Sequence, residues 1–218
     1  MNMNVMHTTW CTKLLHRCLS KRGFMKDVKG VILTDVDGVL LDWTSAFFHH
    51  MTEQGFTPTT KTSVYDMAKK FGMEKPLMQQ MVRQFNESAR IGYLEPHKDA
   101  YWGVKKLAEA GYVFHVITSL SLDKYAGMAR TENLKRIFGD VFDKFVYLDT
   151  GADKDDALAE YKDTNLYWIE DKPKNAELGV KMGLKSILMT HPFSEDITID
   201  NVTKVNNWSN ICDLILDH

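Results

Sequence analysis

The sequence has few cysteines, no long hydrophobic run and no large excess of charge of either sign. Its three cysteines are an odd number without CxxC spacing, which argues against a disulfide framework and indicates a reducing, cytoplasmic location. No run of about eighteen apolar residues occurs, so we expect no transmembrane helix and no membrane partner. The 27 basic and 29 acidic residues leave a formal net charge of −2. The chain therefore lacks the global positive field that stable nucleic-acid binding requires.

What the sequence does contain is typical of one folded domain. Its 218 residues are 44% hydrophobic and 11% aromatic, which is enough to close a compact interior and excludes disorder as the main state. The length predicts one core, with room for an insertion. A homodimer remains open at this stage.

The first 24 residues differ from the rest of the chain. They contain no acidic residue and mix basic residues with threonine, histidine and cysteine, a composition compatible with organelle targeting. The run from Met25 leads directly into the first strong strand, so we interpret residues 1–24 as an N-terminal extension that is poorly ordered. Cys11, His16 and Cys18 cluster there without a fourth ligand, so no structural zinc site is expected.

Short apolar runs of the buried-strand type occur five times, and helix-length polar segments separate the last four of them. The runs are residues 31–34, 112–117, 145–148, 166–169 and 186–189. Helices are expected at residues 101–110, 122–138, 174–182 and 208–216. This alternation predicts an α/β fold with a Rossmann-like parallel sheet.

One interval is far longer than a crossover helix needs. Roughly eighty residues separate the first two strands. Helical spacing within it occurs at residues 44–54, 62–71 and 75–91. We therefore predict a core of residues 25–42 and 98–218 that carries an inserted helical subdomain, the cap, at residues 43–97.

Two acids follow the first strand. Asp35 and Asp37, in the run Asp-Val-Asp-Gly, point to the same side because side chains alternate along a strand. Ligands of open parallel sheets bind at the carboxyl ends of the strands. Two close carboxylates there need a hard cation between them or a shared proton. A simple turn after the strand explains the Asp-Gly pair equally well.

Polar residues also follow the later strands. Thr118 and Ser119 supply hydroxyls after the second strand, although a helix N-cap is the simpler role for Ser119. Lys154 stands at a helix start, where the dipole disfavours a cation, unless it balances the acids around it. Glu170 and Asp171 follow the fourth strand, and solvated surface charge is their alternative role. Together these side chains are the groups that phosphate transfer uses.

The order and spacing of these residues resemble the four-motif signature of the haloacid dehalogenase-like (HAD) superfamily, over about residues 29–192. The motifs are Asp35-x-Asp37, Thr118, Lys154 and the pair Glu170-Asp171. The insertion is similar to the helical cap of that superfamily.

Within the superfamily the sequence looks most like the 5′(3′)-deoxyribonucleotidases. The segments that carry this likeness are residues 35–40, Asp42-Trp43, Phe47-Phe48, Lys124-Tyr125 and residues 133–139. The pair Glu170-Asp171 stands where that group has two aspartates.

The resemblance implies a phosphomonoesterase that acts on a small-molecule phosphate ester. Asp35 would be the nucleophile and form an aspartyl-phosphate. Asp37 would protonate the leaving oxygen and then accept a proton from water. Thr118 and Ser119 would bind phosphoryl oxygens, and Lys154 would neutralise charge on the phosphoryl group.

The resemblance also implies a magnesium cofactor. Its ligands would be Asp35, the backbone carbonyl of Asp37, and Asp171, with water completing an octahedron. Glu170 would not bind the metal directly but would orient a metal-bound water.

We expect the cap to determine substrate choice. Trp43, Phe47 and Tyr65 lie in or beside its helices, and packing the interior of the cap is their alternative role. Trp43 lies six residues after Asp37, where its ring could stack on a planar group above the phosphate. Stacking on a base contributes about 1–3 kcal/mol. Nucleoside monophosphates, and deoxyribonucleotides among them, are therefore the expected substrates.

Other functions remain open. A HAD phosphatase of a sugar phosphate would carry the same core motifs. A nucleic-acid 3′-phosphatase would need a basic track, which the sequence does not offer. A halide-displacing enzyme does not need the second acid, Asp37. A non-catalytic phospho-receiver would carry its acceptor after the third strand, where the chain has Asp149 without a comparable cluster.

Overall fold

The core of the protein is a six-stranded parallel sheet. The structure, a computed structural model, describes residues 28–60 and 65–217. The strands follow the order β3-β2-β1-β4-β5-β6. They are β1 Gly30–Thr34, β2 Tyr112–Ser119, β3 Phe142–Leu148, β4 Tyr167–Glu170, β5 Lys185–Met189 and β6 Val202–Val205. The predicted α/β, Rossmann-like parallel sheet is confirmed, and β6 is a strand that the sequence analysis missed.

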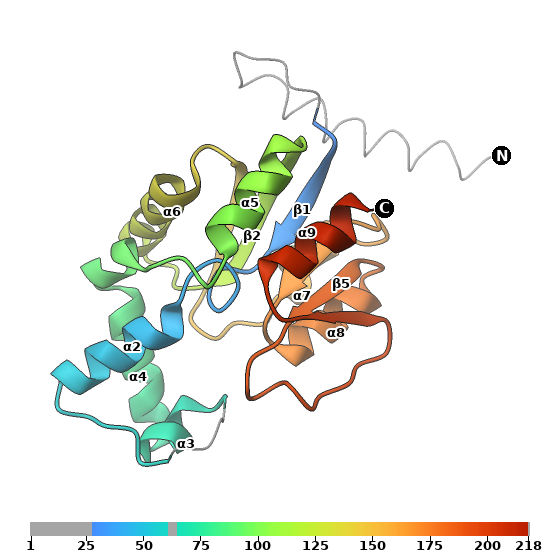
Figure 1. Ribbon diagram of the computed structural model, residues 1–218. Helices are drawn as coiled ribbons and strands as arrows, with labels where there is room; N and C mark the ends of the chain where they lie inside the picture. The colour runs from blue at the N-terminus through green and yellow to red at the C-terminus, as the bar shows by residue number, and fades with distance from the viewer. Residues whose placement is uncertain (1–27, 61–64, 218) are drawn as a thin grey trace.

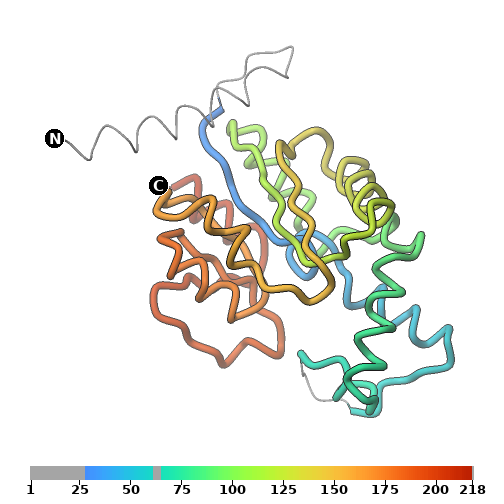
Figure 2. The backbone as a smooth tube through the Cα atoms, turned by 180° about the vertical axis from the view of Figure 1, so that it is seen from behind, coloured from blue at the N-terminus to red at the C-terminus, as the bar shows by residue number. Residues whose placement is uncertain are grey.

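Helices cover both faces of the sheet (Figures 1 and 2). They are α5 Ala100–Glu109, α6 Lys124–Phe138, α7 Asp155–Ala159, α8 Pro173–Lys181 and α9 Trp208–Leu216. One hydrophobic cluster contains Ile32 of β1 and residues of α5, α6 and α9. The other contains Leu33 of β1 and residues of α7 and α8. Because side chains alternate along β1, this central strand is buried on both faces.

The cap lies beyond the end of the sheet that carries the loop after β1 (Figure 1). Its elements are α2 Trp43–Glu53, α3 Met67–Phe71, α4 Lys75–Asn86 and the 3-10 helix η1 Ala89–Tyr93. The rings of Phe71 and Phe85 both pack edge-on against the ring of Phe47 inside it.

Two predicted cap helices differ from the observed ones. The segment predicted as one helix over 75–91 is divided, because Ser88 has extended backbone and its hydroxyl accepts a hydrogen bond from the backbone N–H of Arg90. The helix predicted over 62–71 begins only at Met67, where Asp66 caps it by accepting from two backbone N–H groups. Its residues 62–64 lie outside the described part of the chain.

The N-terminal predictions concern residues that the structure does not describe. Residues 1–24, with the cluster of Cys11, His16 and Cys18, lie outside the described ranges. Among the described helices, none is long and apolar enough to cross a membrane.

Helix α9, the last helix in the described part of the chain, supports the loop that follows β1. Trp208, at the start of α9, is fully buried, and its Nε1 donates to the carbonyl oxygen of Val39 at 2.9 Å. Gly103 of α5 lets this indole approach closely, because a Cβ at that position would lie 2.5 Å from the Trp208 Cβ. The loop between β1 and α2 is therefore anchored to α9 through Trp208.

Candidate active site

The loop after β1 places two carboxylates at the carboxyl edge of the sheet. The backbone N–H of Asp35 donates to the Ile169 carbonyl at 2.9 Å, which fixes this residue between β1 and β4. Gly38 allows the loop to turn, since its φ is +77°, a conformation that side chains with a Cβ disfavour. A Cβ at Gly38 would also lie 2.3 Å from Asp171 Oδ2. Only glycine leaves space for the two acidic loops to meet here.

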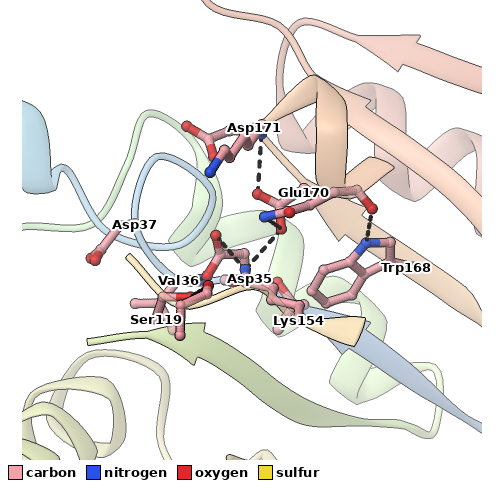
Figure 3. Close-up of polar contacts among 12 residues, drawn as sticks. Asp35, Val36, Asp37, Ser119, Lys154, Trp168, Glu170 and Asp171 are labelled. Atoms are coloured by element: carbon pink, nitrogen blue, oxygen red, sulfur yellow. Dashed lines mark hydrogen bonds and ion pairs between the residues drawn. The ribbon is translucent and has the colours of Figure 1, made fainter. Parts of the chain in front are cut away.

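A buried lysine joins these loops. The Nζ of Lys154 lies 2.8 Å from Asp35 Oδ2 and 2.8 Å from Glu170 Oε2, and Figure 3 shows it between the two carboxylates. Lys154 is 1% exposed. Burial acts to lower its pKa, but Asp35 and Glu170 together raise the pKa above its ordinary value. The ammonium group is therefore charged and in contact with the proposed nucleophile.

Glu170 and Asp171 differ in how their oxygens are used. Glu170 is fully buried, and it accepts hydrogen bonds from Lys154, the backbone N–H of Lys172 and the Asn175 amide. Burial, followed by the neighbouring acids, raises the pKa of both Glu170 and Asp171. Asp35, Glu170 and Asp171 each place one oxygen within 4.8 Å of the others.

Asp37 is paired with an arginine that the sequence analysis missed. Arg130, on α6, is fully buried, and its Nη1 contacts Asp37 Oδ1. Burial raises the pKa of Asp37, and the charge of Arg130 opposes this shift without cancelling it. A signal was present in the sequence: Arg130 stands four residues from Ala126 and from Leu134, on the buried face of the helix.

The charges of the site fit a divalent cation. When ionised, the three clustered carboxyl groups and Asp37 carry four negative charges, whereas Lys154 and Arg130 carry two positive ones. Full ionisation therefore leaves two negative charges in a largely buried site, which is costly without a counter-ion, and the raised pKa values of Asp37, Glu170 and Asp171 reflect that cost. The donors are all oxygen atoms, as hard cations such as Mg²⁺ prefer. The residues present therefore fit a magnesium site.

The two hydroxyls at the end of β2 have different surroundings. Ser119 donates to the Ala152 carbonyl at 2.8 Å and so anchors the loop that leads to Lys154. Thr118 is 1% exposed, and its hydroxyl makes no hydrogen bond to another described residue. Among the described residues, Thr118 therefore has the hydroxyl without a partner, and phosphate binding by Thr118 and by Ser119 stays a prediction.

The aromatic residues predicted to select substrate occupy three different environments. Phe47 is fully buried in the cap. Trp43 is half-buried, stacks on Phe47 with ring centroids 4.6 Å apart, and donates from Nε1 to Asn86. Tyr65 is half-exposed, and its ring meets Phe193 edge-on at 5.1 Å. The Nζ of Lys172 lies 5.6 Å from the centre of this ring, which places Tyr65 beside the loop that carries Glu170 and Asp171.

A histidine after β5 is a second residue that sequence reasoning missed. The Nε2 of His191 lies 2.9 Å from the Gly38 carbonyl oxygen and 3.7 Å from Asp171 Oδ2. Its ring stacks on Phe193. His191 therefore supports both acidic loops from the side of β5.

No family model matches the chain. It is similar to an uncharacterized 32.4 kDa protein of Enterobacteria phage T4, with 28% identity over 142 residues. The match covers 62% of this chain and 51% of the phage protein. The chain thus spans about half the length of that relative.

Solved structures give the fold. A predicted phosphatase from Clostridium acetobutylicum has a TM-score of 0.58 and 15% identity, over 87% of this chain and 99% of that chain. A HAD-superfamily hydrolase from Ehrlichia chaffeensis has a TM-score of 0.50 and 14% identity, over 89% and 98%. The chain has the HAD fold.

A third HAD structure is that of a D,D-heptose 1,7-bisphosphate phosphatase from B. bronchiseptica, complexed with magnesium and phosphate. Its TM-score is 0.55 at 12% identity, over 86% of this chain and 98% of that chain. These comparisons confirm the HAD resemblance at the level of the fold. The likeness to deoxyribonucleotidases stays a prediction.

Proposed function

We propose that the protein is a phosphomonoesterase that uses Asp35 as its nucleophile. The observation that carries this proposal is the buried contact of Lys154 with both Asp35 and Glu170. A carboxylate held beside a fixed ammonium group can approach an anionic phosphate ester without the full repulsion between like charges. The HAD fold supports the proposal, since phosphatases are among its structural neighbours.

The reaction proceeds in two displacements. Asp35 attacks phosphorus while Asp37 gives a proton to the departing ester oxygen, which leaves a phosphoryl group on Asp35. Asp37 then accepts a proton from the water that attacks this group, and inorganic phosphate and the free Asp35 carboxylate result. Thr118 donates to a phosphoryl oxygen, and Lys154 offsets the negative charge in both steps.

We propose Mg²⁺ as the cation of the site. Asp35, Asp171 and the backbone carbonyl of Asp37 would hold it. When bound, it supplies positive charge that offsets the repulsion between nucleophile and phosphate ester.

A simple assay tests the reaction. The full chain should release the phenol of an aryl phosphate when Mg²⁺ is present, a chelator should abolish this activity, and added Mg²⁺ should restore it. If no phosphate ester in a panel of nucleotides, sugar phosphates and aryl phosphates is hydrolysed with Mg²⁺ present, the proposed function is wrong.

The two acids after β4 are expected to differ in their effect on metal affinity. Asp171→Ala removes a proposed ligand, so it should raise the Mg²⁺ concentration for half-maximal activity more than Glu170→Ala does. Loss of a residue that orients the ligands without binding the metal itself typically lowers metal affinity by about 10- to 100-fold. A magnesium titration of both variants measures the difference.

Asp153→Ala is the matched control for this titration, because Asp153 is an exposed acid paired with Lys174 outside the cluster. Its magnesium requirement should equal that of the wild type. Equal effects of Asp171→Ala and Glu170→Ala, or the reverse order, would show that the two roles are exchanged.

We further propose nucleoside monophosphates, deoxyribonucleotides included, as the substrates. Half-buried Trp43 begins the first cap helix directly after the loop that carries Asp35 and Asp37, and half-exposed Tyr65 lies beside the loop that carries Glu170 and Asp171. Both rings can contact a planar group carried by the phosphate.

Trp43→Ala should lower kcat/KM on nucleotides by about 10- to 100-fold, from the usual 1–3 kcal/mol of base stacking. The kcat/KM of Trp43→Ala on a small phosphate ester without a nucleobase should equal that of the wild type. Trp43→Phe is the control, since it keeps a ring against Phe47 and loses only the donor to Asn86. If Trp43→Ala depresses both substrates alike, or the wild type does not prefer nucleotides, the nucleotide proposal fails.

A sugar phosphate is the second candidate substrate. It is favoured by the similarity in fold to the heptose bisphosphate phosphatase, whose coordinates match 86% of this chain. Comparing kcat/KM for a nucleotide and a sugar phosphate on the wild type distinguishes the two candidates.

A further inference from the structure

Arg130 is a buried charge with a single side-chain partner among the described residues. It lies in the middle of α6 and is fully buried. Its Nη1 contacts Asp37 Oδ1. Its Nε and Nη2 are also buried, and neither has a hydrogen-bond partner among the described residues. A guanidinium group offers five N–H donors, so most of its hydrogen-bonding capacity is unused here.

Such an arrangement does little for stability. A buried ion pair is often no more stabilising than apolar side chains of the same volume, and buried donors without partners add a further cost. The neighbours of Arg130 on the same helix face, Ala126 and Leu134, are apolar. A methionine at position 130 would continue that face. The contact with Asp37 therefore explains this arginine better than packing does.

We propose that Arg130 is a positioning residue that holds the Asp37 carboxyl group toward the leaving oxygen of the substrate. The proposal rests on the proposed phosphatase function. The guanidinium group binds Oδ1, which leaves Oδ2 to face the ester. Because Arg130 is fixed within a fifteen-residue helix, it sets the orientation of a loop residue from a rigid element.

The step that Arg130 assists is the departure of the alcohol. The proton on Oδ2 of Asp37 passes to the ester oxygen while the bond from that oxygen to phosphorus breaks and the bond from Asp35 to phosphorus forms. Asp37 is then a carboxylate, and the charge of Arg130 compensates it.

The nature of the leaving group makes this role measurable. An alkoxide must be protonated as it departs, whereas an aryl phosphate releases a stable phenolate that needs little help. For a reaction through a phosphoryl-enzyme, kcat/KM includes only the steps up to the release of the first product. A change, relative to the wild type, in the ratio of kcat/KM for an aryl phosphate to that for an alkyl phosphate therefore reports on proton donation to the leaving group.

Arg130→Met should raise this aryl-to-alkyl ratio by at least about tenfold, which is part of the 10²- to 10⁴-fold worth of general acid catalysis. Arg130→Lys, which keeps a buried cation, should restore part of the loss on the alkyl ester. Arg136→Met is the matched control, because Arg136 lies on the same helix but binds the Gly92 carbonyl and Asn133. Its ratio should equal that of the wild type.

A double variant tests whether Arg130 acts through Asp37. In an Asp37→Asn background there is no acid to orient, so Arg130→Met should leave the ratio unchanged. A further change in that background overturns the proposal, as does an equal loss on both esters in the single variant. If Arg130→Met does not fold, Arg130→Lys supplies the test, and a ratio equal to that of Arg136→Met then overturns the proposal. A wild type that hydrolyses neither ester refutes the proposed function itself, which distinguishes the two failures.

Discussion

Asp35→Asn is expected to reduce hydrolysis of every phosphate ester to the background rate. An amide is not a nucleophile toward phosphorus, so no phosphoryl-enzyme can form. The substitution also removes the carboxylate that contacts Lys154 at 2.8 Å. Initial rates on an aryl phosphate with excess Mg²⁺ measure the loss, and mass spectrometry of the quenched wild type should detect the phosphoryl group on Asp35.

Two comparisons make this result specific. Asp37→Asn should retain more activity than Asp35→Asn and lose about 10²- to 10⁴-fold, the usual worth of acid–base catalysis. Asp149→Asn, at an exposed acid after β3 that pairs with Arg83, should keep the wild-type rate. A near-normal rate in Asp35→Asn would show that another group is the nucleophile.

Lys154→Met is expected to have the largest effect on stability. It leaves Glu170 fully buried without its cation, and breaking a buried pair from one side typically costs about 3–5 kcal/mol. The wild-type pKa of Glu170 is already raised to about 7, chiefly by burial, and losing Lys154 raises it further. The folded variant then binds a proton more tightly than the unfolded chain, so its stability should fall as the pH rises from 5 to 8.

Urea unfolding of Lys154→Met at both pH values measures this effect. Adding Glu170→Gln to the variant removes the unpaired charge, and it should recover part of the free energy of unfolding and most of the pH dependence. An unchanged free energy of unfolding in Lys154→Met would show that the buried contact does not stabilise the fold.

The strands of the core were predictable where burial leaves an apolar run. β1 and β5 each contain three consecutive apolar residues, at 31–33 and 187–189, so the sequence alone located them. β6 was missed because Thr203 and Lys204 are exposed, and its identity as a strand depends on pairing with β5. That pairing is a tertiary contact, and no local pattern in the sequence predicts it.

The motif residues were predictable because parallel strands end at one edge. Asp35, Thr118 and Glu170 each follow or end a strand, so topology alone brings them together. Arg130 and His191 reach the same site from a helix and from a loop after β5. Where those elements pack is decided by the whole core, so neither residue could be placed from its own segment.

The cap shows the limit of pattern analysis most clearly. Aromatic residues at helical spacing serve packing and binding equally well, and the sequence could not separate the two roles. Phe47 is fully buried inside the cap, whereas Tyr65 is half-exposed near the site. Only the packing of helices that are distant in the sequence decides which ring remains accessible.

The hydrogen bond from Trp208 to Val39 has a consequence for the order in which the protein is built. The loop after β1 leaves the ribosome before the indole that binds its Val39 carbonyl, which follows 169 positions later. β1 likewise gains its second neighbour in the sheet only after β4 has been synthesised. During synthesis the proposed nucleophile, Asp35, is therefore on an unsupported loop until α9 has been made. Catalytic competence should arise late and abruptly, when α9 docks.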